Sequence, residues 1–184
     1  MDALRLLIDD HDKVRALFRQ FESAQERGDT SMMDDATAEV ITELKVHTAI
    51  EEKVFYPAVR AEGSDELGEI VREGIEEHHV VDMLIEGIES LDASDEAFVA
   101  KMTVLIENVE HHAGEEENEM FPKASAALGM DRLNTLGARL EEAKRQAIID
   151  SLAKEKLYEQ AKAQGIVGRS TMTKEELAKA LGQV

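Results

Sequence analysis

The sequence contains no cysteine and no tryptophan, and only two of its 184 residues are proline. The absence of cysteine excludes disulfides, zinc–thiolate sites and iron–sulfur clusters. Five phenylalanines and two tyrosines are too few for the aromatic-rich strands that are typical of an all-β protein. The first residues lack the basic and apolar regions of a signal peptide, and no apolar run reaches the roughly 20 residues of a membrane span. We therefore expect a cytoplasmic protein with no membrane partner.

Basic residues are also scarce, because 21 Lys and Arg stand against 40 Asp and Glu, which gives a net charge of −19 at pH 7. The imbalance is concentrated in residues 1–143, which hold 35 acidic and 13 basic residues. A surface of this sign repels nucleic acid and anionic membranes. Most of these carboxylates fit a solvated surface, but carboxylates also bind hard cations.

Apolar residues recur at helical spacing along the chain and predict an all-α fold. Polar segments separate the periodic stretches, with Ser31 and Ser64 as expected helix caps and Gly129 as an expected helix stop. Four long helices with short connections predict an up-down antiparallel four-helix bundle with a C-terminal helical extension. The predicted parts are the bundle over residues 1–130, a connecting helix over 131–150 and a small helix–loop–helix module over 151–184.

An internal repeat is the strongest organisational signal in the sequence. The segment His47–Pro57 matches His112–Pro122 at an offset of 65, and the histidine, two acids, an aromatic residue and the proline coincide. A second pattern, Ile-acid-acid-His, ends at His11 and again at His78. The sequence therefore contains two copies of the same unit, in which a helix with one histidine is followed by a helix with an HxxxE motif.

Histidine and glutamate four residues apart lie on one side of a helix, so each HxxxE motif directs an imidazole and a carboxylate the same way. Two such helices and two helices with a single histidine can direct four histidines and two glutamates at one interior position. Burying these groups uncompensated would cost several kcal/mol each, and metal ions remove that cost. The register of the repeat leaves His79 and His111 outside this set. Glu52 and Glu117 lie about 140° around the helix from the histidine of each motif, so they are expected to be surface acids or acids just outside the ligands. The expected metal ligands are His11, His47, Glu51, His78, His112 and Glu116.

The ordered set H…HxxxEE…EHH…HxxxEE, with FYP and MFP after the two carboxylate motifs, resembles the hemerythrin family and its HHE cation-binding branch over about residues 3–125. The resemblance implies a bundle that holds two iron ions as a non-haem di-iron centre with oxo or hydroxo and carboxylate bridges, and it implies the six ligands named above. It also implies that the small-molecule partner is oxygen, peroxide or nitric oxide, in binding, sensing, iron handling or peroxide decomposition.

Three positions carry open alternatives. Oxygen-carrying hemerythrins have a second histidine where this chain has Asp82, which is either a ligand or catalytic acid–base group beside the metals or the partner of Arg15. Gly74 lies on the ligand face, and it allows either close helix packing or a substrate path. Tyr56 lies about 180° from His47 on a regular helix and is not expected to be a ligand unless Pro57 distorts that helix.

The last residues resemble the helix–loop–helix modules of the SAP and Rho N-terminal type, through LYEQAKAQGI and GRS-M-KEEL-AL. Such modules often bind nucleic acid, but residues 151–184 hold only six basic against four acidic residues. This balance favours a capping or protein-interaction module over nucleic-acid binding. Thr173 and Glu176 predict a capping box within it.

The ligand set is rich in oxygen and favours Fe(III), which argues against a reversible oxygen carrier. The sequence thus favours a di-iron protein that reacts with oxygen, peroxide or nitric oxide. If it is an enzyme, we expect catalase-like peroxide decomposition with Asp82 moving protons. The alternative is a non-catalytic iron-binding or redox-sensor module that signals to the C-terminal segment.

Overall fold

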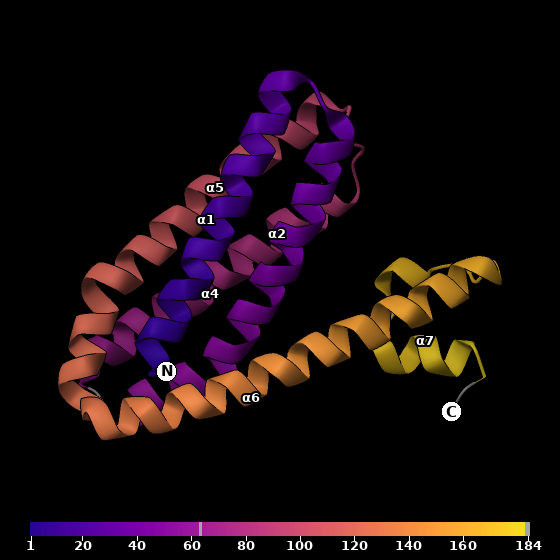
Figure 1. Ribbon diagram of the computed structural model, residues 1–184. Coiled ribbons are helices and arrows are strands. Elements are labelled where there is room, and N and C mark those ends of the chain that lie inside the picture. The colour runs from indigo at the N-terminus through magenta and orange to yellow at the C-terminus, as the bar shows by residue number, and fades with distance from the viewer. Residues whose placement is uncertain (63, 183–184) are drawn as a thin grey trace. The chain divides into compact units, whose positions relative to one another are not determined.

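A computed structural model describes residues 1–62 and 64–182, and this part of the chain is helical without any strand (Figure 1). Four long helices form the up-down bundle that the sequence predicts, and the short helix α3 (Tyr56–Glu62) follows the second of them. The four are α1 (Ala3–Arg27), α2 (Thr30–Ile50), α4 (Asp65–Glu89) and α5 (Glu96–Glu115). The fold class is therefore confirmed.

The chain divides into two compact units, Met1–Glu142 and Ala143–Val184. The boundary falls within α6 (Phe121–Ala163), between the predicted ends of the bundle and of the connecting helix. None of the described helices combines the length and the hydropathy that a membrane span requires. The cytoplasmic location stays a prediction.

Short polar residues start the long helices. The Ser64 hydroxyl accepts from the Leu67 N–H, as predicted. The cap predicted at Ser31 is wrong, because the Asp29 carboxylate accepts from the Met32 N–H at 3.1 Å and begins α2 two residues earlier. Asp29 takes this position because the chain has just reversed at Gly28, whose φ of 66° suits glycine.

The apolar core fills the half of the bundle next to the α1–α2 and α4–α5 turns. Phe21, Ile85, Met102 and Leu105 are among its fully buried side chains. Each large apolar side chain contributes about 1.5–3 kcal/mol when it is removed from water. This half therefore stabilises the bundle almost entirely through apolar side chains, with Thr37 as a buried polar residue, and the histidines and glutamates of the repeat lie in the other half.

Both HxxxE motifs run into a π-helical turn, η1 (Glu51–Phe55) and η2 (Glu116–Met120). The Tyr56 N–H donates to the Glu51 carbonyl, and the Phe121 N–H donates to the Glu116 carbonyl. A π turn accommodates one extra residue, which rotates everything after it by about 100° relative to a regular helix. This rotation turns Tyr56 and Phe121 into the interior, where both side chains are buried.

The beginning of α6 closes the end of the bundle that holds the N-terminus. The backbone leaves helical geometry at Gly129 (φ 72°, ψ 165°), as the sequence predicts, and Leu133, Leu136 and Leu140 are then buried. At Gly137 a side chain would collide with the Met1 carbonyl, so the absence of a Cβ lets the first residues lie against α6.

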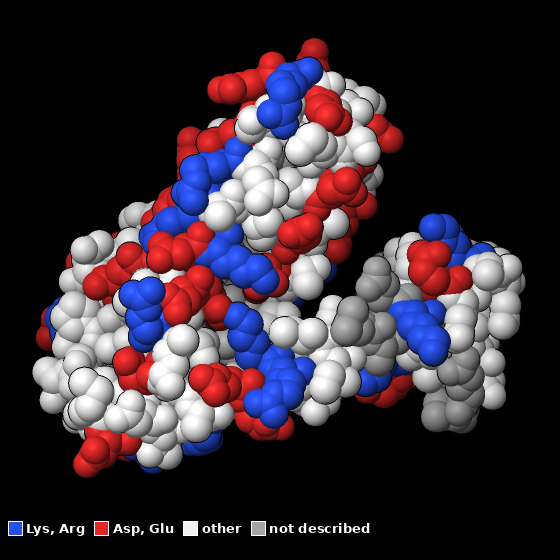
Figure 2. Space-filling model, viewed as in Figure 1, with Lys and Arg blue, Asp and Glu red and all other residues white. Residues whose placement is uncertain are grey.

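The surface of the bundle carries ion pairs that join neighbouring helices. Lys13 pairs with Glu43 at 2.6 Å between α1 and α2, and Lys45 pairs with Glu89 at 2.7 Å between α2 and α4. On the face shown in Figure 2, acidic and basic side chains of the bundle lie interspersed. Exposed pairs of this kind contribute about 0–1 kcal/mol each, so they adjust the packing rather than determine it.

The second unit contains the remainder of α6, the 3₁₀ turn η3 (Arg169–Thr171) and α7 (Lys174–Ala180). The predicted capping box is present, since the Thr173 hydroxyl accepts from the Glu176 N–H and the Glu176 carboxylate accepts from the Thr173 N–H. Ala161 on α6 and Leu177 on α7 are fully buried and form the centre of this small unit.

Candidate metal centre

The structure brings the six predicted ligands together inside the bundle. They come from four long helices and from the first residues of the two π turns, and none exposes more than 6% of its surface. They are His11 on α1, His47 on α2, Glu51 in η1, His78 on α4, His112 on α5 and Glu116 in η2. Convergence of residues that lie up to about a hundred positions apart is the arrangement that the repeat predicts.

One half of the centre is built around His11 and His47, whose Nε2 atoms lie 3.1 Å apart. A Glu116 oxygen lies 3.3 Å from the His11 Nε2, and a Glu51 oxygen lies 3.3 Å from the His47 Nε2. These four donor atoms lie within 4.8 Å of one another. Ligands about 2.0–2.2 Å from a metal ion have separations of this order.

The other half repeats the arrangement with His78 and His112, whose Nε2 atoms are also 3.1 Å apart. The same Glu51 oxygen lies 3.3 Å from the His78 Nε2, and the same Glu116 oxygen lies 3.8 Å from the His112 Nε2. Each glutamate therefore lies between the two histidine pairs. This placement suits a carboxylate that is shared by two ions.

A carboxylate holds the outer nitrogen of the first histidine in each half. Glu117 accepts from the His11 Nδ1 at 2.8 Å, and Glu52 accepts from the His78 Nδ1 at 2.9 Å. The sequence left both glutamates as surface acids or as acids just outside the ligands, and the second interpretation is the one observed. Because Nδ1 carries the proton, each Nε2 presents its lone pair to the centre.

The two remaining histidines have equivalent partners that sequence reasoning missed. Glu77 accepts from the His112 Nδ1 at 2.7 Å, and Asp10 lies 3.7 Å from the His47 Nδ1. The signal was present in the repeat, because Asp10 and Glu77 are the acids that directly precede His11 and His78. A carboxylate thus faces every outer nitrogen of the four histidines.

The inward-facing polar atoms have few partners of their own. Within the described chain, neither oxygen of Glu51 has a hydrogen bond, and the same is true of the Glu116 Oε2. Burial lowers the pKa of His47 to about 4, and burial together with the nearby Glu116 carboxylate raises the pKa of Glu51 well above its ordinary value. Facing imidazole lone pairs and buried carboxylates repel one another, and a cation between them removes this cost.

Tyr56 adds a hydroxyl to this centre on one side only. The phenol donates to the Glu116 Oε1 at 2.9 Å, and its ring stacks on His78 with centroids 5.5 Å apart. The counterpart in the repeat is Phe121, which stacks on His11 at 6.0 Å and has no hydroxyl. The sequence did not predict Tyr56 near the centre on a regular helix, but it left open a distortion of that helix, and the π turn η1 is such a distortion.

Gly74 is explained by the same hydroxyl. A Cβ at this position would lie 2.9 Å from the Tyr56 Oη, which is too close for two non-bonded atoms. The repeat places Leu7 at the equivalent position opposite Phe121, where there is no hydroxyl to accommodate. Of the two interpretations of Gly74 made from the sequence, this contact supports close packing.

Asp82 does not take part in the centre. Its side chain is exposed, and the buried positions of this helical turn belong to Val81 and Ile85. Arg15 bonds instead to Glu117 at 2.8 Å and to Glu110 at 3.0 Å. Neither interpretation of Asp82 fits this geometry. On α4 the Asp82 side chain lies about 40° around the helix from His78, on the side opposite Val81, and this rotation is enough to direct it to solvent.

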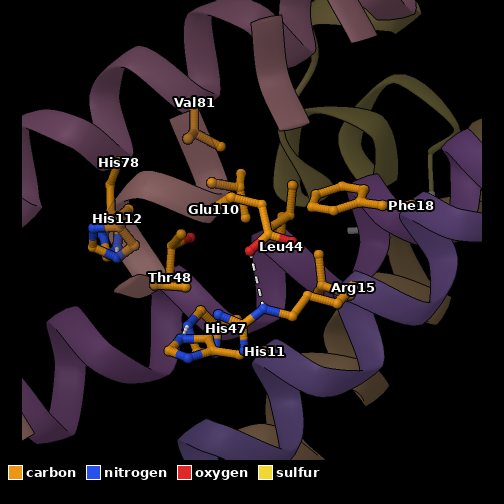
Figure 3. Close-up of a pocket in the computed structure, with 13 residues that line it drawn as sticks. His11, Arg15, Phe18, Leu44, His47, Thr48, His78, Val81, Glu110 and His112 are labelled. Carbon is orange, nitrogen blue, oxygen red and sulfur yellow. Dashed lines mark hydrogen bonds and ion pairs between the residues drawn. The ribbon is translucent and has the colours of Figure 1, made fainter. Parts of the chain in front are cut away.

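An apolar pocket reaches the imidazole side of the centre (Figure 3). It encloses about 420 Å³ including its open mouth, and all four ligand histidines line it. Most of the remaining lining is apolar, with Arg15 and Glu110 as a partly exposed, bonded pair at its outer end. The other lining residues are Val14, Phe18, Leu44, Thr48, Val81, Val109 and Ala113.

Comparison with known proteins gives two matches and one negative result. The family described as hemerythrin HHE cation binding domain matches residues 2–124. Among solved structures, the chain is similar to a hemerythrin HHE cation binding domain-containing protein from Mycobacterium kansasii, with 22% sequence identity and a TM-score of 0.69 over 84% of this chain and 91% of that one. No curated protein matches the chain.

Proposed function

The chain belongs to the hemerythrin HHE cation-binding domain family, and from that premise we propose that its centre holds two iron ions and reacts with, or senses, oxygen, peroxide or nitric oxide. One observation carries the proposal. Four imidazole Nε2 atoms and two buried carboxylates face one another inside the bundle, while a carboxylate faces the outer nitrogen of every imidazole.

The donor set fits two ions better than one. His11 and His47 would hold one ion and His78 and His112 the other, with Glu51 and Glu116 shared between them. Six side chains cannot fill the coordination of two octahedral ions, so positions remain for a small molecule. A structural zinc site is normally closed by four ligands and explains neither the second pair of histidines nor the shared carboxylates.

The chemistry of the donors favours iron. Imidazole and carboxylate are ligands of iron, and the chain contains no thiolate that would favour copper(I) or an iron–sulfur cluster. Two buried carboxylates supply negative charge that stabilises the more oxidised, more highly charged ion. Iron would supply the electrons for reactions with oxygen, peroxide or nitric oxide.

The protein's own groups orient the ligands and control access. Glu117 fixes the His11 ring and is itself held by Arg15, so the imidazole has one orientation. The apolar pocket suits small uncharged molecules, because a charged one would lose its hydration among Phe18, Leu44 and the neighbouring aliphatic side chains.

Peroxide decomposition is the enzymatic form of the proposal. The Tyr56 hydroxyl bonds to Glu116, and burial, with the carboxylates of Glu51 and Glu116, raises its pKa well above its ordinary value. The phenol therefore keeps its proton and holds Glu116 in place rather than acting as a base. The structure gives Asp82, the expected proton carrier, no contact with the centre.

A sensor is the second candidate, and one feature of the chain favours it. α6 begins at Phe121, the residue that stacks on the His11 ring, and continues to Ala163 in the second unit. A change at His11 could therefore be transmitted along this segment, whose two helical parts meet at the break at Gly129. In this case the centre would change state without turning over peroxide.

Metal analysis of the purified protein, with absorption spectra before and after peroxide, tests the proposal. We expect two irons per chain, oxygen-to-iron charge-transfer absorption, and gas evolution for the enzyme or its absence for the sensor. Protein that binds fewer than two irons when iron is supplied would contradict the proposal. The variant His78→Ala should lose iron from its half of the centre.

The role of the pocket is tested by a pair of equal substitutions on α5. Val109→Phe fills the pocket, whereas Val104→Phe places the same ring at an exposed position of the same helix. We expect both variants to hold two irons and only Val109→Phe to react more slowly with peroxide or oxygen. Equal rates would show that the reactant uses another path.

A further inference from the structure

The two halves of the repeat are alike at the ligands but differ around them. In the first half, three positions near the ligands are apolar and buried, whereas in the second half the equivalent residues are a glycine, an exposed histidine and a half-buried glutamate. The apolar set is Leu7, Val46 and Ile50, and its counterparts are Gly74, His111 and Glu115. The surroundings of the buried centre are therefore apolar in one half and polar in the other.

The polar side carries a second group of metal-ligand type. His111 lies 3.3 Å from a Glu115 oxygen, one turn along α5, and 3.8 Å from the Glu77 Oε1 on α4. The three donor atoms lie within 4.8 Å of one another, which matches the separations around an ion with ligands about 2.0–2.2 Å away. The side chain of His111 is 65% exposed and that of Glu115 39%, so solvent cations reach both.

A small pocket leads inward from this group. It encloses about 180 Å³ including its open mouth, and it has Glu77 and Glu115 on the outside and His112 and Glu116 on the inside. Gly74, Ile70 and Met120 complete the lining. Glu116 lies at the inner end of this pocket, and its Oε2 has no hydrogen bond in the described part of the chain.

We propose that Glu77, His111 and Glu115 form a second, weaker cation site through which divalent metal ions enter the buried centre. The proposal rests on the two-metal function proposed above. It adds a site outside the six ligands and a direction of loading, from the polar half of the repeat inward.

The geometry provides a continuous series of ligands. Glu77 has one oxygen directed to His111 and the other bonded to the His112 Nδ1 at 2.7 Å, so it touches both the outer group and a ligand of the centre. Two carboxylates attract a dication, while three donors bind it loosely enough for it to move on. The first half of the repeat offers no such series, because Val46 and Ile50 occupy the equivalent positions.

The test measures the rate of iron uptake rather than activity. Metal-free protein is mixed with ferrous iron without oxygen, and iron that a chromophoric chelator cannot remove is counted over time. The variant His111→Ala/Glu115→Gln removes the outer group. The matched control, Glu76→Gln/His79→Ala, removes another exposed glutamate–histidine pair, 3.4 Å apart on α4, which does not line the small pocket.

We expect the variant to take up iron about tenfold more slowly than the wild type, in line with the loss of local charge attraction. It should reach the same final content of two ions. The control should load at the wild-type rate. Equal rates in all three proteins would overturn the loading site. A wild-type protein that never holds two ions would overturn the proposed function instead, so the two failures are distinct.

A binding measurement gives an independent readout. Zinc added to protein whose centre is already filled should show one further weak site by calorimetry, present in the wild type and the control and lost in His111→Ala/Glu115→Gln. A further site that persists in this variant would contradict the assignment of its ligands.

Discussion

The buried Glu51 carboxylate should destabilise the metal-free protein, and the substitution Glu51→Gln should reverse this effect. Glu51 is fully buried, and neither of its oxygens has a hydrogen bond in the described structure. The Nε2 atoms of His47 and His78 each lie 3.3 Å from its Oε2, and the Glu116 carboxylate is a further neighbour. A glutamine amide has the same size, carries no charge and can donate to these nitrogens, so the metal-free variant should be more stable.

The size of the gain follows from the buried group. An unsatisfied buried polar group costs about 1–3 kcal/mol. We therefore expect Glu51→Gln to raise the free energy of unfolding of the metal-free protein by about 1–3 kcal/mol at pH 7. For a chain of this length, each kcal/mol corresponds to about 2–4 °C in Tm.

The gain should depend on pH in a defined direction. Burial and the Glu116 carboxylate raise the pKa of Glu51 above its ordinary value of 4.5. Below about pH 4.5 the carboxyl is protonated in both the folded and the unfolded chain, so it costs nothing. Above that pH the unfolded chain loses the proton and the folded chain retains it, so the wild type loses stability as pH rises towards the raised pKa. The advantage of the variant should therefore grow between about pH 4.5 and 7.

Urea denaturation of chelator-treated protein measures the effect, and the neighbouring substitution Glu52→Gln is the control. Glu52 is partly exposed and already bonds to the His78 Nδ1, so Glu52→Gln should change the stability of the metal-free protein by less than about 0.5 kcal/mol. With iron supplied, Glu51→Gln should fail to hold two ions. A metal-free Glu51→Gln protein less stable than the wild type, or one that keeps both ions, would refute the reasoning.

Further predictions concern the surroundings of the centre. Tyr56→Phe should keep two irons and lose about 1–3 kcal/mol of metal-free stability, measured by denaturation, because the Glu116 Oε1 loses its donor; loss of iron would show that the phenol is itself a ligand. Gly74→Ala should be destabilising in the wild type but not in the Tyr56→Phe background, where the contact with the hydroxyl is gone, and additive effects in this double-mutant cycle would contradict that contact. Asp82→Ala should leave the iron content by metal analysis unchanged, since the side chain is exposed. Iron affinity should fall as the pH is lowered, because protons compete for imidazole and carboxylate ligands, and a pH-independent affinity would exclude these donors.

The bundle and the convergence of the six residues could be predicted because both depend on local periodicity and on the repeat. The i,i+4 spacing of His47 and Glu51 fixes their common direction within one helix, and duplication then supplies the opposite half. No knowledge of how the helices are placed is needed for that step, because a buried imidazole and carboxylate must find partners somewhere in the core.

The surroundings could not be predicted to the same degree, because they depend on geometry between helices and on departures from regular helix. Glu117 belongs to the fourth bundle helix in sequence but orients His11 on the first, a pairing that no spacing along the chain reveals. Tyr56 enters the centre only because η1 contains one residue more than a regular turn. The prediction for Asp82 is wrong although its helix is regular, because a rotation of a few tens of degrees around that helix separates a ligand position from solvent.

Duplication explains why the centre can be nearly symmetric while its surroundings are not. The six expected ligands match in both halves, as two ions with the same donors would require, but Phe121 and Tyr56 occupy equivalent positions with different chemistry. The hydroxyl of Tyr56 in turn requires Gly74, and the missing side chain contributes to the small pocket that opens on the same side. The differences are therefore linked, and one half of the repeat supplies the closed wall of the centre while the other supplies its polar contacts with the surface.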